Sequence, residues 1–228
     1  MSVFPRLPAS CHAAAVPSGG VTVRAALCLP PRATRSAAAI VLHGCGGFDT
    51  FDHRLAVALP AAGIATLYLD YFGPTPPPGR RGFCGGPPAL GTAFPVWERV
   101  VADAAGVLRA DAAIDPRRIA LVGWSLGGGL ALATALAHPH LFDALVGFST
   151  GLPARVRLPG AAALPPTLLL SGGAHDAIPL SETENLVRVL RAAHVPVSLF
   201  VYRDGVHSWP GRQGAAGIAA AERFLRRL

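Results

Sequence analysis

Short apolar runs alternate along the chain with longer segments of helical period, and this alternation constrains the fold more than any other feature of the sequence. The apolar runs have the length of strands that are buried on one or both faces, and they occupy residues 21–29, 38–42, 64–69, 119–122, 144–148, 167–170 and 197–202. Helices are expected at residues 51–62, 95–110, 126–137, 180–193 and 214–228. The sequence therefore predicts an α/β fold, with a mostly parallel central sheet of about seven strands and helices on its flanks.

Length and composition predict a single domain over residues 1–228. Hydrophobic residues make up 51% of the chain and charged residues only 14%, so the chain can bury a large core and global disorder is excluded. Residues 1–20 are expected to form an irregular N-terminal segment. Residues 73–94, rich in Pro and Gly, form a long loop that is expected near a site, with a plain surface insertion as the alternative.

Charge gives little support for a macromolecular partner. All 20 basic side chains are Arg and the net charge is +7, which favours anionic partners. The arginines are scattered, however, and no basic stripe interleaved with aromatic residues is present, so nucleic-acid binding is not expected. An anionic small substrate stays open, and the sequence does not predict an oligomeric state.

The cysteines and the apolar runs exclude further classes. Cys11, Cys28, Cys45 and Cys84 form no CxxC pair, so no structural zinc site is predicted, and neither a metal nor an organic cofactor is expected. No apolar run reaches the roughly 18 residues of a membrane span. Because no continuous apolar stretch near the N-terminus resembles an export signal, a cytoplasmic location is expected.

The segment Gly-Trp-Ser-Leu-Gly at residues 123–127 fits the pattern G-x-S-x-G. It directly follows the apolar run at 119–122 and directly precedes the helical segment at 126–137. A nucleophilic serine projects from such a sharp strand-to-helix turn, because small residues two positions before and after it let the strand and the helix approach closely. Ser125 is therefore the candidate nucleophile, and a mere glycine-rich turn is the alternative.

A serine nucleophile requires a base and an acid that orients the base. In folds with this turn the acid and then the histidine follow later in the chain, each on a loop after a strand. Asp176 follows the run at 167–170 and His207 follows the run at 197–202. Asp204 and Asp143 are the rival acids. The other histidines considered lie in predicted helices, at helix ends or in the leading segment: His12, His53, His138, His140 and His194.

The tetrahedral intermediate of acyl transfer also needs backbone N–H groups directed at its oxyanion. One is expected from Leu126, at the positive end of a helix. The other is expected from the Gly-rich stretch after the run at 38–42, with Cys45 preferred and Gly46 the next candidate. A nucleophilic role for the Cys45 thiol is the rival interpretation. Cys45 could also form a disulfide with Cys84, which would tie the long loop over the site.

These motifs together resemble the α/β-hydrolases, and more narrowly the dienelactone hydrolase family. The resemblance rests on VLHGCGGFDTF, LYLDYFGP, GWSLGGG, GGAHDAIP and DGVHSW, in this order. It implies an α/β-hydrolase fold without a cap domain. Family members that open dienelactones use a cysteine nucleophile, whereas this chain has Ser125, which favours a general serine esterase or lactonase. The family binds substrate carboxylates with arginines, but no motif assigns that role to Arg80, Arg81 or Arg212.

The expected function is hydrolysis of a small carboxylic ester or lactone through an acyl-enzyme intermediate, with Ser125, Asp176 and His207 as the catalytic residues. A small-molecule substrate is the expected partner. A non-catalytic binding protein with the same fold is the alternative from another class. Acyl transfer to another acceptor and peptide hydrolysis are alternatives that use the same residues.

Overall fold

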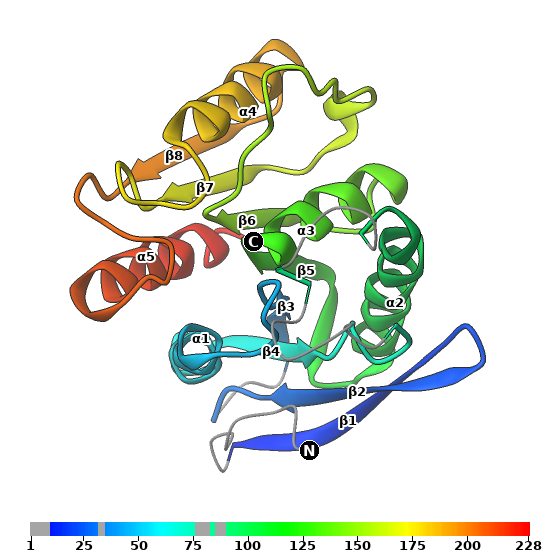
Figure 1. Ribbon diagram of the computed structural model, residues 1–228. Coiled ribbons are helices and arrows are strands. Elements are labelled where there is room, and N and C mark those ends of the chain that lie inside the picture. Colours follow the sequence, from blue (N-terminus) through cyan, green and yellow to red (C-terminus); the bar gives the residue numbers. More distant parts are fainter. Residues whose placement is uncertain (1–9, 32–34, 76–82, 85–89) are drawn as a thin grey trace.

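A computed structural model describes residues 10–31, 35–75, 83–84 and 90–228. Within these residues, eight strands form one sheet in the order β1-β2-β4-β3-β5-β6-β7-β8 (Figure 1). Their bounds are β1 Cys11–Ser18, β2 Val21–Cys28, β3 Ser36–Leu42, β4 Ile64–Leu69, β5 Ile114–Trp124, β6 Ala144–Phe148, β7 Thr167–Ser171 and β8 Val197–Val201. The pairs β1–β2 and β2–β4 are antiparallel. All the other neighbouring pairs in this order, from β4–β3 to β7–β8, are parallel. The predicted α/β fold with a mostly parallel sheet is confirmed.

Five α-helices cover the two faces of the sheet in the part of the chain that the structure describes. They are α1 Thr50–Ala61, α2 Leu90–Ala110, α3 Leu126–Ala137, α4 Leu180–Ala192 and α5 Gly211–Leu225. Helices α1 and α5 pack on one face, and α2, α3 and α4 pack on the other (Figure 1). None of these described helices is both long and apolar enough to cross a membrane.

The buried strands supply side chains to both faces, which explains their continuous apolar sequences. In β3, Ile40 packs in the cluster with α2, α3 and α4, whereas Val41 packs in the cluster with α1 and α5. In β5, Leu121 and Val122 divide in the same way. Because neighbouring residues of a strand point to opposite faces, a strand covered by helices on both sides needs an apolar residue at every position.

The expectation of an irregular segment over residues 1–20 was wrong for residues 11–18, whereas residues 1–9 lie outside the described part of the chain. Residues 11–18 form β1, which pairs with β2 along its whole length, from Cys11 opposite Cys28 to Ser18 opposite Val21. Strand β1 is an edge strand whose buried residues include Val16 and Ser18. A strand that is mostly exposed has a weak apolar signal, and β1 was therefore missed and the sheet has one strand more than expected.

Helix α2 begins at Leu90, five residues before the expected start at Pro95. Proline is easily accommodated in the first turn of a helix, which suggested Pro95 as its start. The turn before Pro95 is stabilised by packing, because Ala93 is buried in the core. The predicted loop at 73–94 is shorter by these residues, and most of its remainder, residues 76–82 and 85–89, lies outside the described part of the chain.

Two disulfides join the four cysteines: Cys11 to Cys28 and Cys45 to Cys84. The pairing of Cys45 with Cys84, considered from the sequence, is confirmed, and the pairing of Cys11 with Cys28 was not foreseen. The Cys11–Cys28 bond joins two residues that lie directly opposite each other in the β1–β2 hairpin. Sequence analysis missed it because the bond depends on a strand that it did not predict.

We predict that the double variant Cys11→Ser/Cys28→Ser loses about 3 kcal/mol of unfolding free energy, because the bond closes a loop of 17 residues in the unfolded chain. Urea unfolding of wild type and variant without reductant measures the loss. Thiol titration of the denatured, unreduced wild type should detect no free thiol. Two or more free thiols per chain, or an unchanged unfolding midpoint, would contradict the pairing.

Candidate active site

Ser125 lies at the tight turn between β5 and α3. Its backbone has φ 55° and ψ −116°, in a region that non-glycine residues rarely adopt. Its N–H donates to the Phe148 carbonyl of the neighbouring strand at 2.9 Å, and its carbonyl accepts from the Gly129 N–H at 3.1 Å. The turn is therefore fixed from both sides, and it holds the Ser125 side chain at the carboxyl edge of the sheet.

Two glycines, one on either side of Ser125, allow this turn to form. A Cβ atom on Gly123 would lie 2.3 Å from the Gly127 carbonyl oxygen, and one on Gly127 would lie 2.1 Å from the Leu42 carbonyl oxygen. Both distances are far below van der Waals contact with backbone atoms that cannot rotate away. The G-x-S-x-G pattern is thus a packing requirement between α3, β5 and β3.

We predict opposite effects for two alanine substitutions in α3. Gly127→Ala lowers the free energy of unfolding by about 3 kcal/mol, because its methyl group meets the backbone of β3. Gly129→Ala, two residues later in the same helix, meets no atom within 4 Å and raises it by about 0.5–1 kcal/mol through helix propensity. Chemical denaturation of both variants measures the effects, and a similar loss in both would refute the packing argument.

Three side chains predicted from the sequence come together at this edge. The His207 Nε2 atom is 3.0 Å from the Ser125 Oγ atom, and the His207 Nδ1 atom is 2.6 Å from Asp176 Oδ1. Asp176 lies on the loop after β7 and His207 on the loop after β8. The Asp176 side chain is fully buried, whereas that of His207 is 26% exposed. The histidine therefore lies between a solvent-accessible hydroxyl and a buried carboxylate.

Asp176 is held as a carboxylate by its hydrogen bonds. Burial alone would raise its pKa, but hydrogen bonds from His207, Ser149 and the backbone N–H groups of Gly172 and Ile178 outweigh burial and hold the pKa below its ordinary value. An ionised carboxylate at neutral pH is what fixes the tautomer of the histidine, with Nδ1 donating to Asp176 and Nε2 free to accept from Ser125.

The rival acids lie elsewhere. The Asp143 carboxylate accepts a hydrogen bond from the Ile119 N–H at 2.9 Å, at the opposite edge of the sheet. Asp204 is exposed and forms a backbone bridge with Gly173. Neither contacts His207 through a hydrogen bond that the structure records. Asp176 is thus the acid that the fold brings to the histidine.

Three polar contacts around these residues were not anticipated from the sequence. The Trp124 indole N–H donates to the His207 carbonyl at 2.9 Å. Ser149, just after β6, donates a hydrogen bond to Asp176. Trp209, two residues after His207, donates a hydrogen bond to the Ser149 hydroxyl. Position after an apolar run is a signal that could have marked Ser149, but the sequence does not show which way its hydroxyl points.

The loop after β3 lies beside Ser125 and carries the expected oxyanion residue. Cys45 and Leu126 both line a cleft of about 320 Å³ that contains Ser125. The other lining residues that the structure describes are Phe83, Cys84, Gly129, Ser149, Thr150, Gly151 and Ile178. Their positions are compatible with the predicted oxyanion roles of the Cys45 and Leu126 N–H groups, which remain predictions. The cysteine of this loop is in a disulfide, which removes the thiol that the rival interpretation needs.

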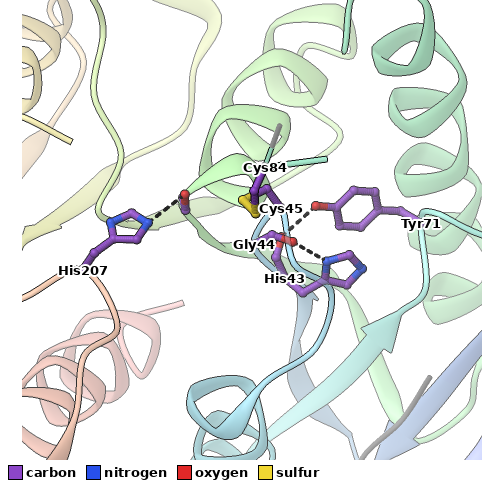
Figure 2. Close-up of a disulfide and its surroundings, with 7 residues drawn as sticks. His43, Gly44, Cys45, Tyr71, Cys84 and His207 are labelled. Atoms are coloured by element: carbon purple, nitrogen blue, oxygen red, sulfur yellow. Dashed lines mark hydrogen bonds between the residues drawn. A yellow bond between two sulfur atoms is a disulfide. The ribbon is translucent and has the colours of Figure 1, made fainter. Parts of the chain in front are cut away.

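His43 and its contacts hold the loop after β3 in place. It is fully buried, its ring stacks on Tyr71 with ring centroids 4.2 Å apart, and its Nδ1 donates to the Gly44 carbonyl at 2.8 Å. Burial lowers the pKa of His43 to about 4, so the ring is neutral at physiological pH. The Tyr71 hydroxyl donates to the His43 carbonyl at 2.7 Å (Figure 2). These contacts fix the backbone of the loop immediately before Cys45.

Comparison with known proteins agrees with this geometry. The family model described as phospholipase/carboxylesterase matches residues 104–226, more than half of the chain, and the model described as serine aminopeptidase S33 matches residues 33–164. The chain belongs to the α/β-hydrolases. The enzyme class that follows from the phospholipase/carboxylesterase match is carboxylic ester hydrolase. An uncharacterized protein of Mycobacterium tuberculosis is 28% identical to the hydrolase over 82% of this chain and 69% of its own length.

Solved structures with the same fold are more distant in sequence. A Klebsiella pneumoniae protein assigned as a dienelactone hydrolase superimposes with a TM-score of 0.77 at 20% identity, covering 96% of this chain and 98% of its own. A dienelactone hydrolase-like promiscuous phosphotriesterase from metagenomic libraries gives 0.79 at 18% identity, with coverages of 96% and 98%. A Pyrobaculum calidifontis esterase gives 0.75 at 17% identity, with coverages of 95% and 84%. The fold thus agrees with the resemblance that the motifs indicate.

Within the described ranges, no three His, Cys, Asp or Glu side chains gather closely enough to hold a metal ion.

The Cys45–Cys84 disulfide joins the loop after β3 to a segment of the long loop after β4 (Figure 2). The Phe83 N–H also donates to the Cys45 carbonyl at 2.8 Å. Phe83 is buried, with its ring 4.6 Å from that of Phe72 and 4.8 Å from that of Trp97. The covalent bond therefore connects the Cys45 backbone to an aromatic cluster of the core.

We predict that Cys84→Ser lowers the kcat/KM of the hydrolase for an ester about tenfold, because the loop after β3 loses its covalent connection and the N–H groups expected to bind the oxyanion are less well preorganised. The matched control is Cys11→Ser/Cys28→Ser, which breaks the disulfide far from the cleft and should retain kcat/KM within about twofold. Steady-state kinetics of both variants make the comparison. An equal effect of the two changes would contradict a local role for the Cys45–Cys84 bond.

Proposed function

We propose that the protein hydrolyses small carboxylic esters or lactones through a covalent acyl-enzyme intermediate on Ser125. The observation that supports this most directly is the continuous hydrogen-bond chain from Ser125 Oγ through His207 to Asp176, with distances of 3.0 and 2.6 Å. The cleft beside Ser125, of about 320 Å³ among the described residues, has the size of a site for a small molecule.

In the first step, Ser125 Oγ attacks the ester carbonyl carbon while His207 Nε2 takes the hydroxyl proton. The oxyanion of the tetrahedral intermediate accepts hydrogen bonds from the Cys45 and Leu126 N–H groups. His207 then gives its proton to the alcohol oxygen, the C–O bond breaks, and the acyl group stays on Ser125. In the second step His207 activates a water molecule, which releases the acid and restores the serine. Asp176 stabilises the imidazolium in both steps.

We predict that Ser125→Ala lowers kcat for a p-nitrophenyl ester by at least about 10³-fold, because the nucleophile is removed. The variant keeps its fold, as circular dichroism and thermal unfolding measure. The wild type should react with a serine-directed fluorophosphonate at Ser125, which mass spectrometry locates. Near-normal turnover by the variant would exclude Ser125 from the mechanism, and a folded wild type that is inert to the probe would favour a non-catalytic binding protein.

Peptide hydrolysis is a second candidate, which the match to serine aminopeptidase S33 favours. It uses the same three residues with an amine as leaving group. A panel of aminoacyl p-nitroanilides beside p-nitrophenyl esters separates the two, and we expect the esters to be cleaved preferentially because their leaving group is better. Acyl transfer to an acceptor other than water would appear as ester products when alcohols are added.

The charge of the substrate is a separate part of the proposal. Among the described residues that line the cleft none is charged, which suits a neutral acyl group. Arg80 and Arg81, considered for binding an anionic substrate, lie outside the described residues, and Arg212 is exposed on α5. An anionic substrate therefore stays a prediction, and comparison of acetate esters with hemisuccinate esters tests it.

The expected cytoplasmic location also stays a prediction. Two disulfides count against it, because structural disulfides are rare in the reducing cytosol and common in oxidising compartments.

A further inference from the structure

The Ser149 hydroxyl lies between the catalytic acid and a buried indole. Its Oγ atom is 2.5 Å from Asp176 Oδ2 and 2.8 Å from the Trp209 Nε1 atom. Ser149 and Trp209 are both fully buried. Ser149 follows β6 directly, whereas Trp209 comes from the loop after β8 that also carries His207. Three loops of the sheet edge therefore meet at one hydroxyl group.

The chemistry of the two neighbours fixes the direction of these hydrogen bonds. An indole N–H can only donate and an ionised carboxylate can only accept. The Ser149 hydroxyl must therefore accept from Trp209 and donate to Asp176. Its hydrogen has a single orientation, which is a stronger constraint than an isolated serine side chain would experience.

The two oxygens of Asp176 then have separate tasks. Oδ2 accepts from Ser149 and from the Gly172 N–H at 2.7 Å. Oδ1 accepts from His207 at 2.6 Å and from the Ile178 N–H at 3.1 Å. Because the side chain is fully buried, no solvent is positioned to replace a donor that is lost. Rotation of the carboxylate about its Cβ–Cγ bond is opposed by the donors on Oδ2, and this keeps Oδ1 directed at His207.

We propose that Ser149 and Trp209 are positioning residues of the hydrolytic reaction, acting through Asp176. Trp209 orients the Ser149 hydroxyl, Ser149 fixes the Asp176 carboxylate, and Asp176 orients His207. Because Trp209 is two residues after His207, the chain of hydrogen bonds returns to the loop on which the base lies. These side-chain hydrogen bonds, together with backbone hydrogen bonds, fix the loops that carry Asp176 and His207 relative to each other. This inference rests on the proposed function, since it assigns a purpose to the orientation of His207.

The backbone of Ser149 supports a specific role. Its φ of 48° lies in the left-handed region, where serine is less favoured than glycine. Glycine at this position would relieve the backbone strain, whereas serine keeps the strain and supplies the hydroxyl group that Asp176 accepts from. The Trp209 backbone also has a positive φ, of 51°. Ser149 and Trp209 are thus both held in backbone conformations that their surroundings must impose.

The test compares Ser149→Ala, Ser149→Gly and Trp209→Phe with wild type in ester hydrolysis. We expect Ser149→Ala and Ser149→Gly each to lower kcat about tenfold with KM unchanged within about twofold, because the Ser149 hydroxyl, although Ser149 borders the cleft, is buried and directed at Asp176. Ser149→Gly guards against misfolding, since glycine accepts the local φ. Trp209→Phe keeps an aromatic ring but removes the N–H, and should lower kcat about threefold. Rates are normalised to the fraction of sites that react with the fluorophosphonate.

The matched control is Thr75→Ala. Thr75 is the hydroxyl partner of another buried indole, since the Trp97 N–H donates to its Oγ atom, but this pair has no hydrogen bond to a catalytic residue. Thr75→Ala should leave kcat within about twofold. An unchanged kcat in both Ser149 variants, or an equal loss of kcat in Thr75→Ala, would overturn the proposal.

A second readout does not depend on activity. The Ser149 hydroxyl helps to hold the pKa of folded-state Asp176 below its ordinary value. This hydrogen bond therefore stabilises the fold when the pH is above the ordinary pKa of Asp. The stabilisation is lost as the pH falls through the pKa of Asp176 in the folded state. The destabilisation by Ser149→Ala should therefore be larger at pH 7 than at pH 3, whereas that by Thr75→Ala should not depend on pH. Among the groups that donate hydrogen bonds to Asp176, His207 is the titratable side chain. The Ser149 hydroxyl and the two backbone N–H groups do not titrate between pH 3 and pH 7.

The two readouts separate failure of this inference from failure of the proposed function. If wild type hydrolyses no ester and ignores the fluorophosphonate, the proposed function fails, and the unfolding measurements still decide whether Ser149 holds Asp176. If wild type is active through Ser125 but the Ser149 variants keep their kcat and show pH-independent destabilisation, the proposed function stands and the positioning role is refuted.

Discussion

The close approach of α3 to β3 is the constraint on which the rest of the site depends. The backbone of Gly127 comes so near the Leu42 carbonyl that no side chain fits between them. This contact forces the chain to turn sharply after β5 and places Ser125 in an unfavourable backbone conformation. The cost is met by the buried parallel sheet around it, whose strands are apolar at every position because helices cover both faces.

Once the turn is fixed, the parallel sheet determines where the other groups can come from. The loops after β6, β7 and β8 all leave the sheet at the same edge, and each contributes one polar side chain: Ser149, Asp176 and His207. A side chain on such a loop needs only a short reach to find its neighbours. The loop after β3 adds backbone N–H groups on the other side of the serine, supported by the neutral, buried ring of His43. The site is thus assembled from separate loops on one rigid edge.

Much of this could be predicted from the sequence because the signals are local. Continuous apolar runs identify buried strands, and glycines two positions from a serine identify the turn. Chain order then selects Asp176 and His207. What the sequence did not reveal depends on partners far along the chain. Strand β1 is exposed on its outer side and is defined by pairing with β2. The directions of the Trp124, Ser149 and Trp209 side chains are set by packing, which leaves no periodic signal.

The two disulfides lie outside most of the elements that form the sheet and the site. Strands β3 to β8 and the three loops that carry Ser125, Asp176 and His207 contain no cystine. Material produced in a reducing bacterial cytosol can therefore fold with these elements in place while lacking both cross-links. Air oxidation during purification would then form the cross-links in only part of the molecules, and the preparation would become a mixture. Secretion of the recombinant chain into the periplasm is the route to a homogeneous enzyme.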